Sequence, residues 1–326
     1  MNVAILLPEL AVVEAVADPR YMFNVVNQFL KEQGSEKHFN IQMVGLKNKV
    51  TFSDGAFTME SDATIENAQK PDLVIIPALS RDIEDAVKIN EAFIPWITEQ
   101  YKDGAEIASL CLGAFLLAST GLLRNKPCST HWLFANKFRD MFPHVNLVDD
   151  KIVTEVNGLY SSGGANSYWN LLLHLVEKYV DRKMAILVSK FFVLNINTRS
   201  QSHFSIFQGQ KMHEDDDILE AQNFIEENID QKYTVPELSK KFNIGKRSFE
   251  RRFKKATQNT VLEYTQRVKV EAAKKKLEIS QKTVSEIMFS VGYNDANAFR
   301  DMFKKITGMT PYQYRNKYNK EAILMN

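Results

Sequence analysis

Short apolar runs alternate with helical patterns over the first two hundred residues. The first run, residues 3–7, is continuously apolar, as expected for a strand buried on both faces, and similar short runs occupy residues 41–44, 73–77 and 106–110. Between them, apolar positions recur at helical spacing over residues 21–33, 80–90, 91–102 and 113–123. This alternation predicts an α/β layer with a mostly parallel sheet, in which ligands gather at the carboxyl ends of the strands.

The last third of the chain contains one pattern twice. Residues 234–264 recur as residues 283–314, with an offset of 49 residues up to a turn and 50 after it. Ten pairs keep their identity: Thr234/Thr283, Val235/Val284, Glu237/Glu286, Phe249/Phe299, Phe253/Phe303, Lys254/Lys304, Lys255/Lys305, Thr257/Thr307, Thr260/Thr310 and Tyr264/Tyr314. Each copy predicts a short helix, a tight turn and a longer basic helix, which is a helix-turn-helix.

Local signals support this all-α interpretation. Thr234 with Glu237, and Thr283 with Glu286, form the capping-box pattern of a helix start. The phenylalanines of each second helix are four residues apart and are expected to face inward. Residues 260–280 contain neither Gly nor Pro and predict a connecting helix. Such a helix would space the two second helices by about 34 Å, one turn of DNA.

The charge is unevenly distributed along the chain. The formal total is only +1, but residues 231–326 carry 21 Lys and Arg against 9 Asp and Glu, while residues 211–230 carry 1 against 8. The basic end indicates a polyanionic partner, or else a solvated lysine-rich surface. The acidic stretch suits a helix start, where carboxylates meet free N–H groups, and a second interpretation is competition with DNA for the basic face.

Cysteine content and hydropathy limit the protein class. Two cysteines, Cys111 and Cys128, do not make a disulfide framework, which fits a reducing cytoplasm. The first residues lack the basic lead of a signal peptide, and the longest uncharged run, residues 156–176, is too polar for a membrane span. We therefore expect a cytoplasmic protein without a membrane partner, and we expect neither a metal nor a cofactor.

A thiol lies where a strand runs directly into a helix. Cys111 follows the strand 106–110 and precedes Gly113, so the helix start could depress its pKa, while Gly113 would allow a close backbone approach. His131 is the candidate partner of this thiol, and Glu14, after the first strand, is a candidate carboxylate at the same end of the sheet. The alternatives are a small core cysteine, a structural histidine and a surface glutamate.

Residues 108–123 (ASLCLGAFLLASTGLL) and 129–132 (STHW) resemble the class I glutamine amidotransferase-like domain, of the PfpI/ThiJ kind, found in GlxA-type transcription regulators. Residues 161–177 and 199–204 continue the similarity, which covers about residues 1–205. It implies a flavodoxin-like doubly wound parallel sheet and a pocket formed by Glu14, Cys111, Leu112 and His131. Ala78-Leu79 departs from the family, which has glycines there that help to form an oxyanion hole, and this weakens an enzymatic interpretation. Ser129 and Asn170 also depart from the family pattern.

The duplicated region, with its ending Gly308-Met309-Thr310-Pro311-Tyr312-Gln313-Tyr314-Arg315, resembles the AraC/XylS-type DNA-binding domain over residues 216–318. Side chains at the start of each second helix are expected at base edges, and the later lysines at phosphates. The expected DNA-binding residues are Lys246, Arg247, Ser248, Glu250, Arg251, Asn294, Asn297, Ala298, Arg300, Lys304 and Lys305. Where the family often has Arg, this chain has Asp301, with the arginine one place earlier at Arg300.

Together these patterns predict a sensor domain at 1–205, an acidic linker at 206–217 and a DNA-binding domain at 218–320. The predicted function is a sequence-specific transcription regulator that senses a small-molecule effector, binds double-stranded operator DNA as a homodimer, and contacts RNA polymerase if it activates. The alternatives are a cysteine-dependent hydrolase or glyoxalase-like activity, or redox sensing through Cys111.

Overall fold

The computed structural model describes residues 1–52, 55–80, 82–196, 200–202, 204–207, 209–211 and 213–319. The chain forms two compact units, Met1–Gln201 and Ser202–Asn326. Within the motif at residues 199–204, Arg199 and His203 lie outside the described residues. No helix in the described part of the chain is long and apolar enough to span a bilayer.

The first unit is built on a seven-stranded sheet. Its order is β10 (Val153–Val156), β11 (Leu159–Ser162), β7 (Glu106–Ser109), β6 (Leu73–Ile76), β1 (Asn2–Leu7), β2 (Asn40–Gly45) and β5 (Ala63–Thr64). All neighbours are parallel except β10 and β11. The four predicted strands are therefore confirmed as β1, β2, β6 and β7. Two small ribbons, β3 (Lys49–Phe52) with β4 (Phe57–Glu60) and β8 (Pro127–Cys128) with β9 (Asn146–Leu147), complete the strands.

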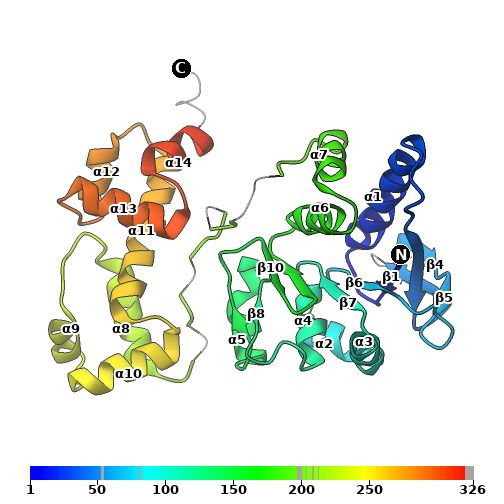
Figure 1. Ribbon diagram of the computed structural model, residues 1–326. Helices are drawn as coiled ribbons and strands as arrows, with labels where there is room; N and C mark the ends of the chain where they lie inside the picture. The colour runs from blue at the N-terminus through cyan, green and yellow to red at the C-terminus, as the bar shows by residue number, and fades with distance from the viewer. Residues whose placement is uncertain are drawn as a thin grey trace. The chain divides into compact units, whose positions relative to one another are not determined.

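Helices cover both faces of this sheet (Figure 1). On one face lie α1 (Val13–Glu32), α6 (Tyr168–Tyr179) and α7 (Arg182–Phe191), and on the other lie α2 (Ile83–Ile89), α3 (Phe93–Lys102) and α4 (Gly113–Ser119). The short α5 (Ala135–Met141) packs near β9. This arrangement confirms the predicted doubly wound α/β fold, because the central strands are buried between two helical layers.

Helix α1 starts earlier than predicted. The expected helix began at residue 21, but α1 begins at Val13 and contains Pro19, whose ring is buried. Proline removes one hydrogen bond from a helix interior, and Asp18-Pro19 resembles a turn in the sequence. Burial of an apolar face on the sheet nevertheless keeps the segment helical. As a result, Glu14, which lies before the start of the expected helix, belongs to the first turn of α1.

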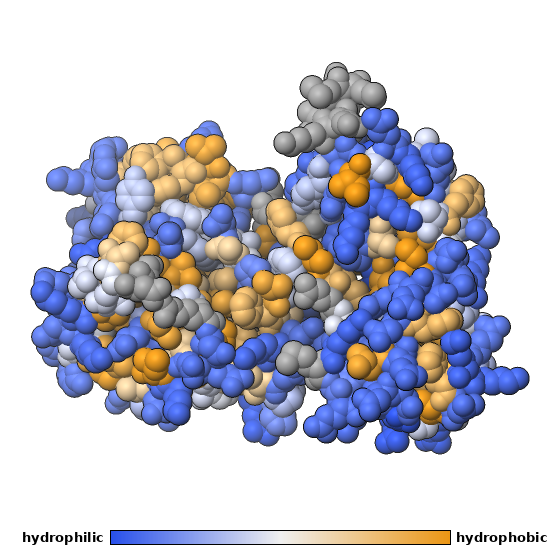
Figure 2. Space-filling model, turned by 180° about the vertical axis from the view of Figure 1, so that it is seen from behind, coloured by the Kyte–Doolittle hydropathy of each residue, from blue (hydrophilic) through white to orange (hydrophobic). Residues whose placement is uncertain are grey.

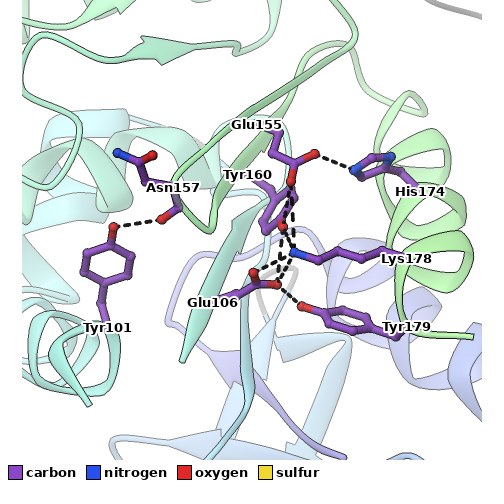
Figure 3. Close-up of polar contacts among 8 residues, drawn as sticks. All are labelled: Tyr101, Glu106, Glu155, Asn157, Tyr160, His174, Lys178 and Tyr179. Atoms are coloured by element: carbon purple, nitrogen blue, oxygen red, sulfur yellow. Dashed lines mark hydrogen bonds and ion pairs between the residues drawn. The ribbon is translucent and has the colours of Figure 1, made fainter. Parts of the chain in front are cut away.

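A polar cluster anchors the amino end of β7 (Figure 3). Lys178 of α6 donates to both carboxylate oxygens of Glu106, at 2.6 and 2.9 Å, and the hydroxyls of Tyr160 and Tyr179 also donate to this carboxylate. Burial opposes ionisation of Glu106, but Lys178 and the tyrosines hold its pKa below the usual value. The cluster joins β7, β11 and α6 at the end of the sheet opposite Cys111, and so it fixes the strand that carries the thiol.

The regular structure in the described residues of the second unit is entirely helical. It consists of α8 (Asp216–Glu227), α9 (Val235–Lys241), α10 (Lys246–Thr257), α11 (Val261–Ile279), α12 (Val284–Ser290), α13 (Ala296–Thr307) and α14 (Pro311–Tyr318). One core lies among α8–α10 and the start of α11, and a second lies among the rest of α11 and α12–α14. The predicted connecting helix is confirmed as α11, which contributes to both cores.

The local features predicted for the repeat are confirmed. The capping boxes at Thr234 and Thr283 are formed, and the four phenylalanines Phe249, Phe253, Phe299 and Phe303 are buried. Two further capping boxes, at Thr260 and Thr310, start α11 and α14. Figure 2 shows a largely hydrophilic visible face on this helical unit, as expected when the aromatic side chains form cores.

Candidate functional site

Cys111 lies on a sharp turn between β7 and α4. Its φ of 50° is in the left-handed region, which is uncommon for a residue with a side chain. Its N–H donates to Ser162 Oγ at 3.2 Å, and its carbonyl accepts from Thr130 Oγ1 at 3.0 Å. A Cβ on Gly113 would lie 2.5 Å from the Pro77 carbonyl oxygen, so only glycine fits there. The predicted strand-to-helix turn and the reason for Gly113 are both confirmed.

The thiol is not the reactive anion that its position suggested. Cys111 is only 5% exposed, and burial raises its pKa to about 12, although the N–H of Leu112 acts in the opposite direction. The expected depression of the pKa is therefore wrong. The reason is that removal from water disfavours a thiolate more than the start of the short helix α4 stabilises it.

His131 makes its contacts within its own turn. It precedes the 3-10 turn Trp132–Phe134, and its Nδ1 accepts a hydrogen bond from Leu133 N–H at 3.1 Å. Burial lowers its pKa, and its ring packs against those of Trp132 and Phe134. Within the described ranges, no hydrogen bond joins His131 to Cys111. The neighbouring Thr130 makes the contact instead, through the Cys111 carbonyl.

Two carboxylates and a tyrosine lie beside the cysteine turn. Asp18, one helical turn after the exposed Glu14, accepts a hydrogen bond from Tyr168 Oη at 2.6 Å. Burial and repulsion from Glu14 raise the pKa of Asp18, although the tyrosine lowers it. Burial raises the pKa of Tyr168, as do its hydrogen bond to Asp18 and the charges of Asp18 and Glu14.

Our sequence interpretation missed Asp18 and Tyr168. Asp18 follows Glu14 by four residues, the spacing that places side chains on one helical face. Tyr168 lies within the segment 161–177, which the resemblance already included. Both signals were present, but the helix was predicted to begin only at residue 21, so the helical spacing of Glu14 and Asp18 was not considered.

The loop after β6 is already hydrogen bonded to the backbone after β1. Ala78 O accepts from Val12 N–H at 2.8 Å, Ser80 N–H donates to Leu10 O at 2.7 Å, and Ala11 pairs with Leu79 as an isolated bridge. These bonds hold in place the Ala78-Leu79 loop, where the resemblance leads us to expect oxyanion-hole glycines.

The predicted DNA-binding side chains all lie on α10 and α13 or in the turn before them. In the first copy, Lys246, Arg247, Glu250 and Arg251 are exposed and Ser248 is half-buried. In the second copy, Asn294, Asn297, Ala298, Arg300, Lys304 and Lys305 are all exposed. Each helix therefore presents one polar face opposite its buried phenylalanines, which is the geometry of a recognition helix.

The two exposed faces differ in their ion pairs. Arg300 lies 3.4 Å from its neighbour Asp301, and both side chains are largely exposed. Asp295 caps α13 by accepting from Ala298 N–H at 2.6 Å. Arg251 has no ion-pair partner among the described residues, whereas the next residue, Arg252, is bonded to Asp215 and Asp217. The first helix therefore retains more unpaired positive charge.

Comparison with known proteins identifies relatives of both units. Residues 20–178 match the DJ-1/PfpI family, and residues 238–317 match a helix-turn-helix domain family. The chain is 23% identical over 268 residues to the HTH-type transcriptional regulator GbdR of Pseudomonas aeruginosa, covering 82% of this chain and 72% of GbdR. It is 20% identical over 264 residues to the HTH-type transcriptional regulator CdhR of the same organism, covering 81% and 77%.

Among solved structures, the chain is similar to one from Vibrio parahaemolyticus that is described as a transcriptional regulator protein. The TM-score is 0.53 at 23% identity, covering 59% of this chain and 98% of that chain. This similarity shows the α/β fold.

Proposed function

Because the chain is an AraC-type helix-turn-helix transcriptional regulator with a DJ-1/PfpI-like amino-terminal domain, we propose that it binds promoter DNA through α10 and α13. The observation that carries this proposal is the pair of equivalent helices, each with an exposed polar face over a buried phenylalanine pair. Bases would be contacted by Lys246, Arg247, Ser248, Glu250, Arg251, Asn294, Asn297, Ala298 and Arg300. Lys304 and Lys305 would contact phosphates.

The α/β unit would sense a small-molecule effector. Its pocket would be formed by Glu14, Cys111, Leu112 and His131, with Asp18 and Tyr168 added by the structure. The effector would act by binding one arrangement of the regulator more tightly than another. The raised pKa of Cys111 supports binding rather than catalysis, so we propose that the unit is not an enzyme. A cysteine-dependent hydrolase would need a thiolate and an adjacent base.

Other partners follow from the class of protein. We propose a cytoplasmic homodimer that contacts RNA polymerase if it activates transcription. Exposed apolar side chains on and beside α7, including Phe191 at 50% and Val193 at 91%, support self-association of the α/β unit. More hydrophobic colour is visible on this unit than on the helical unit in Figure 2.

The function is tested with the full-length chain. Genome-wide mapping of bound sites would supply candidate promoters, and mobility shifts would then be measured with those fragments and with scrambled competitors. We expect a specific shift at one or more promoters, altered by the matching effector. Absence of any specific shift, with and without candidate effectors, would refute the proposal.

A further inference from the structure

The segment that enters the helical unit is docked on it. We use the term strap for the described residues of 204–217. Lys274 donates to the Ser205 carbonyl at 2.6 Å, and Glu271 accepts from Phe207 N–H at 3.1 Å. Lys274 and Glu271 are themselves a buried ion pair, with N···O 2.8 Å and exposures of 5% and 12%. The strap therefore satisfies hydrogen bonds that this buried pair would otherwise lack.

The middle of the strap packs into the first helix-turn-helix core. The Phe207 ring meets the Tyr264 ring edge-to-face at 5.3 Å, and a Cβ on Gly209 would collide with the Tyr264 hydroxyl. Gln222 of α8, which is fully buried, donates to the Gln210 carbonyl at 2.8 Å. This close approach makes the strap part of the helical unit's fold rather than a free linker.

The end of the strap holds α10 through Arg252. Arg252 Nε lies 2.9 Å from Asp215 Oδ2, and Arg252 Nη2 reaches both Asp215 Oδ1 and Asp217 Oδ2, the latter at 2.7 Å. Asp215 also caps α8 by accepting from Ile218 N–H at 3.3 Å. The hydrogen bond with Arg252 lowers the pKa of Asp215, which favours the charged form of this carboxylate. A bidentate arginine contact fixes direction as well as distance.

The described residues of the second helix-turn-helix contain no equivalent of these Arg252 ion pairs. The repeat offset of 50 places Met302 of α13 where Arg252 lies in α10, and Met302 packs against the second core. Arg252 is occupied by these carboxylates, whereas the adjacent Arg251 is exposed and unpaired among the described residues. We use the term clamp for the ion pairs of Arg252 with Asp215 and Asp217. The clamp is thus specific to the first recognition helix, α10.

We propose that Arg252 is a positioning residue. It orients the first recognition helix through Asp215 and Asp217 and does not bind DNA itself. The strap begins directly after the α/β unit in the chain. A change that loosens the strap would therefore alter the orientation of α10 through Asp215 and Asp217. The inference rests on the proposed function, because orientation of α10 matters only if α10 binds DNA.

The test compares four forms of the full-length chain: wild type, Arg252→Met, Arg251→Met as the matched control, and Asp215→Asn with Asp217→Asn. Methionine keeps the apolar stem and is the residue at the equivalent position of the second copy. Affinity for a promoter fragment would be measured over a series of salt concentrations. The salt slope is the slope of the logarithm of the binding constant against the logarithm of the salt concentration. Hydrogen exchange of the first α8 amides would be measured without DNA.

We expect Arg252→Met to weaken binding by about threefold to tenfold without changing the salt slope. Arg251→Met should weaken binding by about fivefold to 150-fold, as loss of a base contact does. The double carboxylate variant should weaken binding as Arg252→Met does, and both should speed exchange in α8. These results would support the clamp.

Three results would overturn it. Tighter binding by the carboxylate variant would show that Arg252 is a DNA cation held back by acidic competitors. A reduced salt slope in Arg252→Met would show direct phosphate contact. Unchanged exchange in α8 would show that the ion pairs position nothing, and this readout does not depend on DNA. If wild type binds no promoter but exchange rises in both variants, the proposed function fails while the clamp on α10 stands.

Discussion

At the scale of single residues, solvent access decides what Cys111 can do. The turn gives the thiol the backbone geometry of a nucleophile, with a φ of 50° and the N–H of Leu112 beside it. Burial nevertheless keeps it protonated, since a thiolate loses its hydration there without gaining a cation. A buried, protonated thiol contributes its shape and its polarisable sulfur to a pocket, and it does not contribute reactivity.

This protonated state predicts slow alkylation. The pKa of Cys111 lies at about 12 against an ordinary value of 9.0, and that of Cys128 is likewise raised to about 12 by burial. At about pH 8 the thiolate fraction should fall roughly a thousandfold relative to a free thiol, and the rate of reaction with iodoacetamide should fall with it. Mass spectrometry of the labelled native protein would check this, with denaturant-unfolded protein as the control. Rapid labelling of native Cys111 would contradict it and would restore the enzymatic and redox alternatives.

At the scale of elements, the repeat preserves backbone conformation more faithfully than sequence. Asn243 in the turn of the first copy has φ 52°, and Gly292 at the equivalent place in the second has φ 76°. After the second helices, Gln258 and Gly308 are again left-handed, with φ of 56° and 77°. Left-handed residues end helices in both copies, and glycine adopts this conformation without strain.

The two glycines of the second copy provide a matched comparison. A Cβ on Gly292 would lie 2.5 Å from the Asp230 carbonyl oxygen, whereas one on Gly308 would meet nothing within 4 Å. We expect Gly308→Ala to lower the free energy of unfolding by about 1 to 2 kcal/mol through backbone strain alone. Gly292→Ala should cost about 1 to 3 kcal/mol more, because the turn must also move away from Asp230.

Denaturation followed by far-UV circular dichroism would measure both variants. Tryptophan fluorescence would not serve, because Trp96, Trp132 and Trp169 all belong to the α/β unit. If the two variants lose the same free energy of unfolding, the turn at Gly292 can move away from the Asp230 carbonyl at no extra cost.

Much of this architecture could be predicted from the sequence because its signals are local. The capping boxes depend on residues three apart, and the phenylalanine pairs on residues four apart, so both were found. The pKa of Cys111, the partners of Arg252 and the approach of Tyr168 to Asp18 depend on residues far apart in the chain. No local pattern encodes how deeply a thiol is buried or which carboxylate occupies an arginine. These features required the structure.

At the scale of the whole molecule, positive charge is concentrated in the helical unit and unevenly within it. On α10 five cations remain after Arg252 is engaged by its carboxylates: Lys246, Arg247, Arg251, Lys254 and Lys255. On α13 the cations are Arg300, Lys304 and Lys305, with Asp301 beside Arg300. Because phosphate neutralisation drives affinity, the two recognition helices should contribute unequally.

We therefore expect Arg251→Ala to weaken promoter binding more than Arg300→Ala. Loss of the unpaired Arg251 should cost about 1 to 3 kcal/mol of binding free energy, as a good base contact does. Loss of Arg300 should cost less than about 1 kcal/mol, because Asp301 already offsets part of its charge. Titration of a labelled promoter at one fixed salt concentration would rank the two variants. The opposite order would mean that the second helix dominates.

The order of the units along the chain has a consequence for folding. Val3 of β1 pairs with Leu73 of β6, 70 residues later, whereas α9 and α10 pack within a stretch of 23 residues. Distant strand pairing is slow to form, and local helix contacts form quickly. The slower half is synthesised first, and the 125 residues from Ser202 onward take about 6 to 25 s to translate. We expect each new chain to complete its α/β sheet while its last helices are still being synthesised, so that the helix-turn-helix repeat leaves the ribosome attached to an already folded α/β unit.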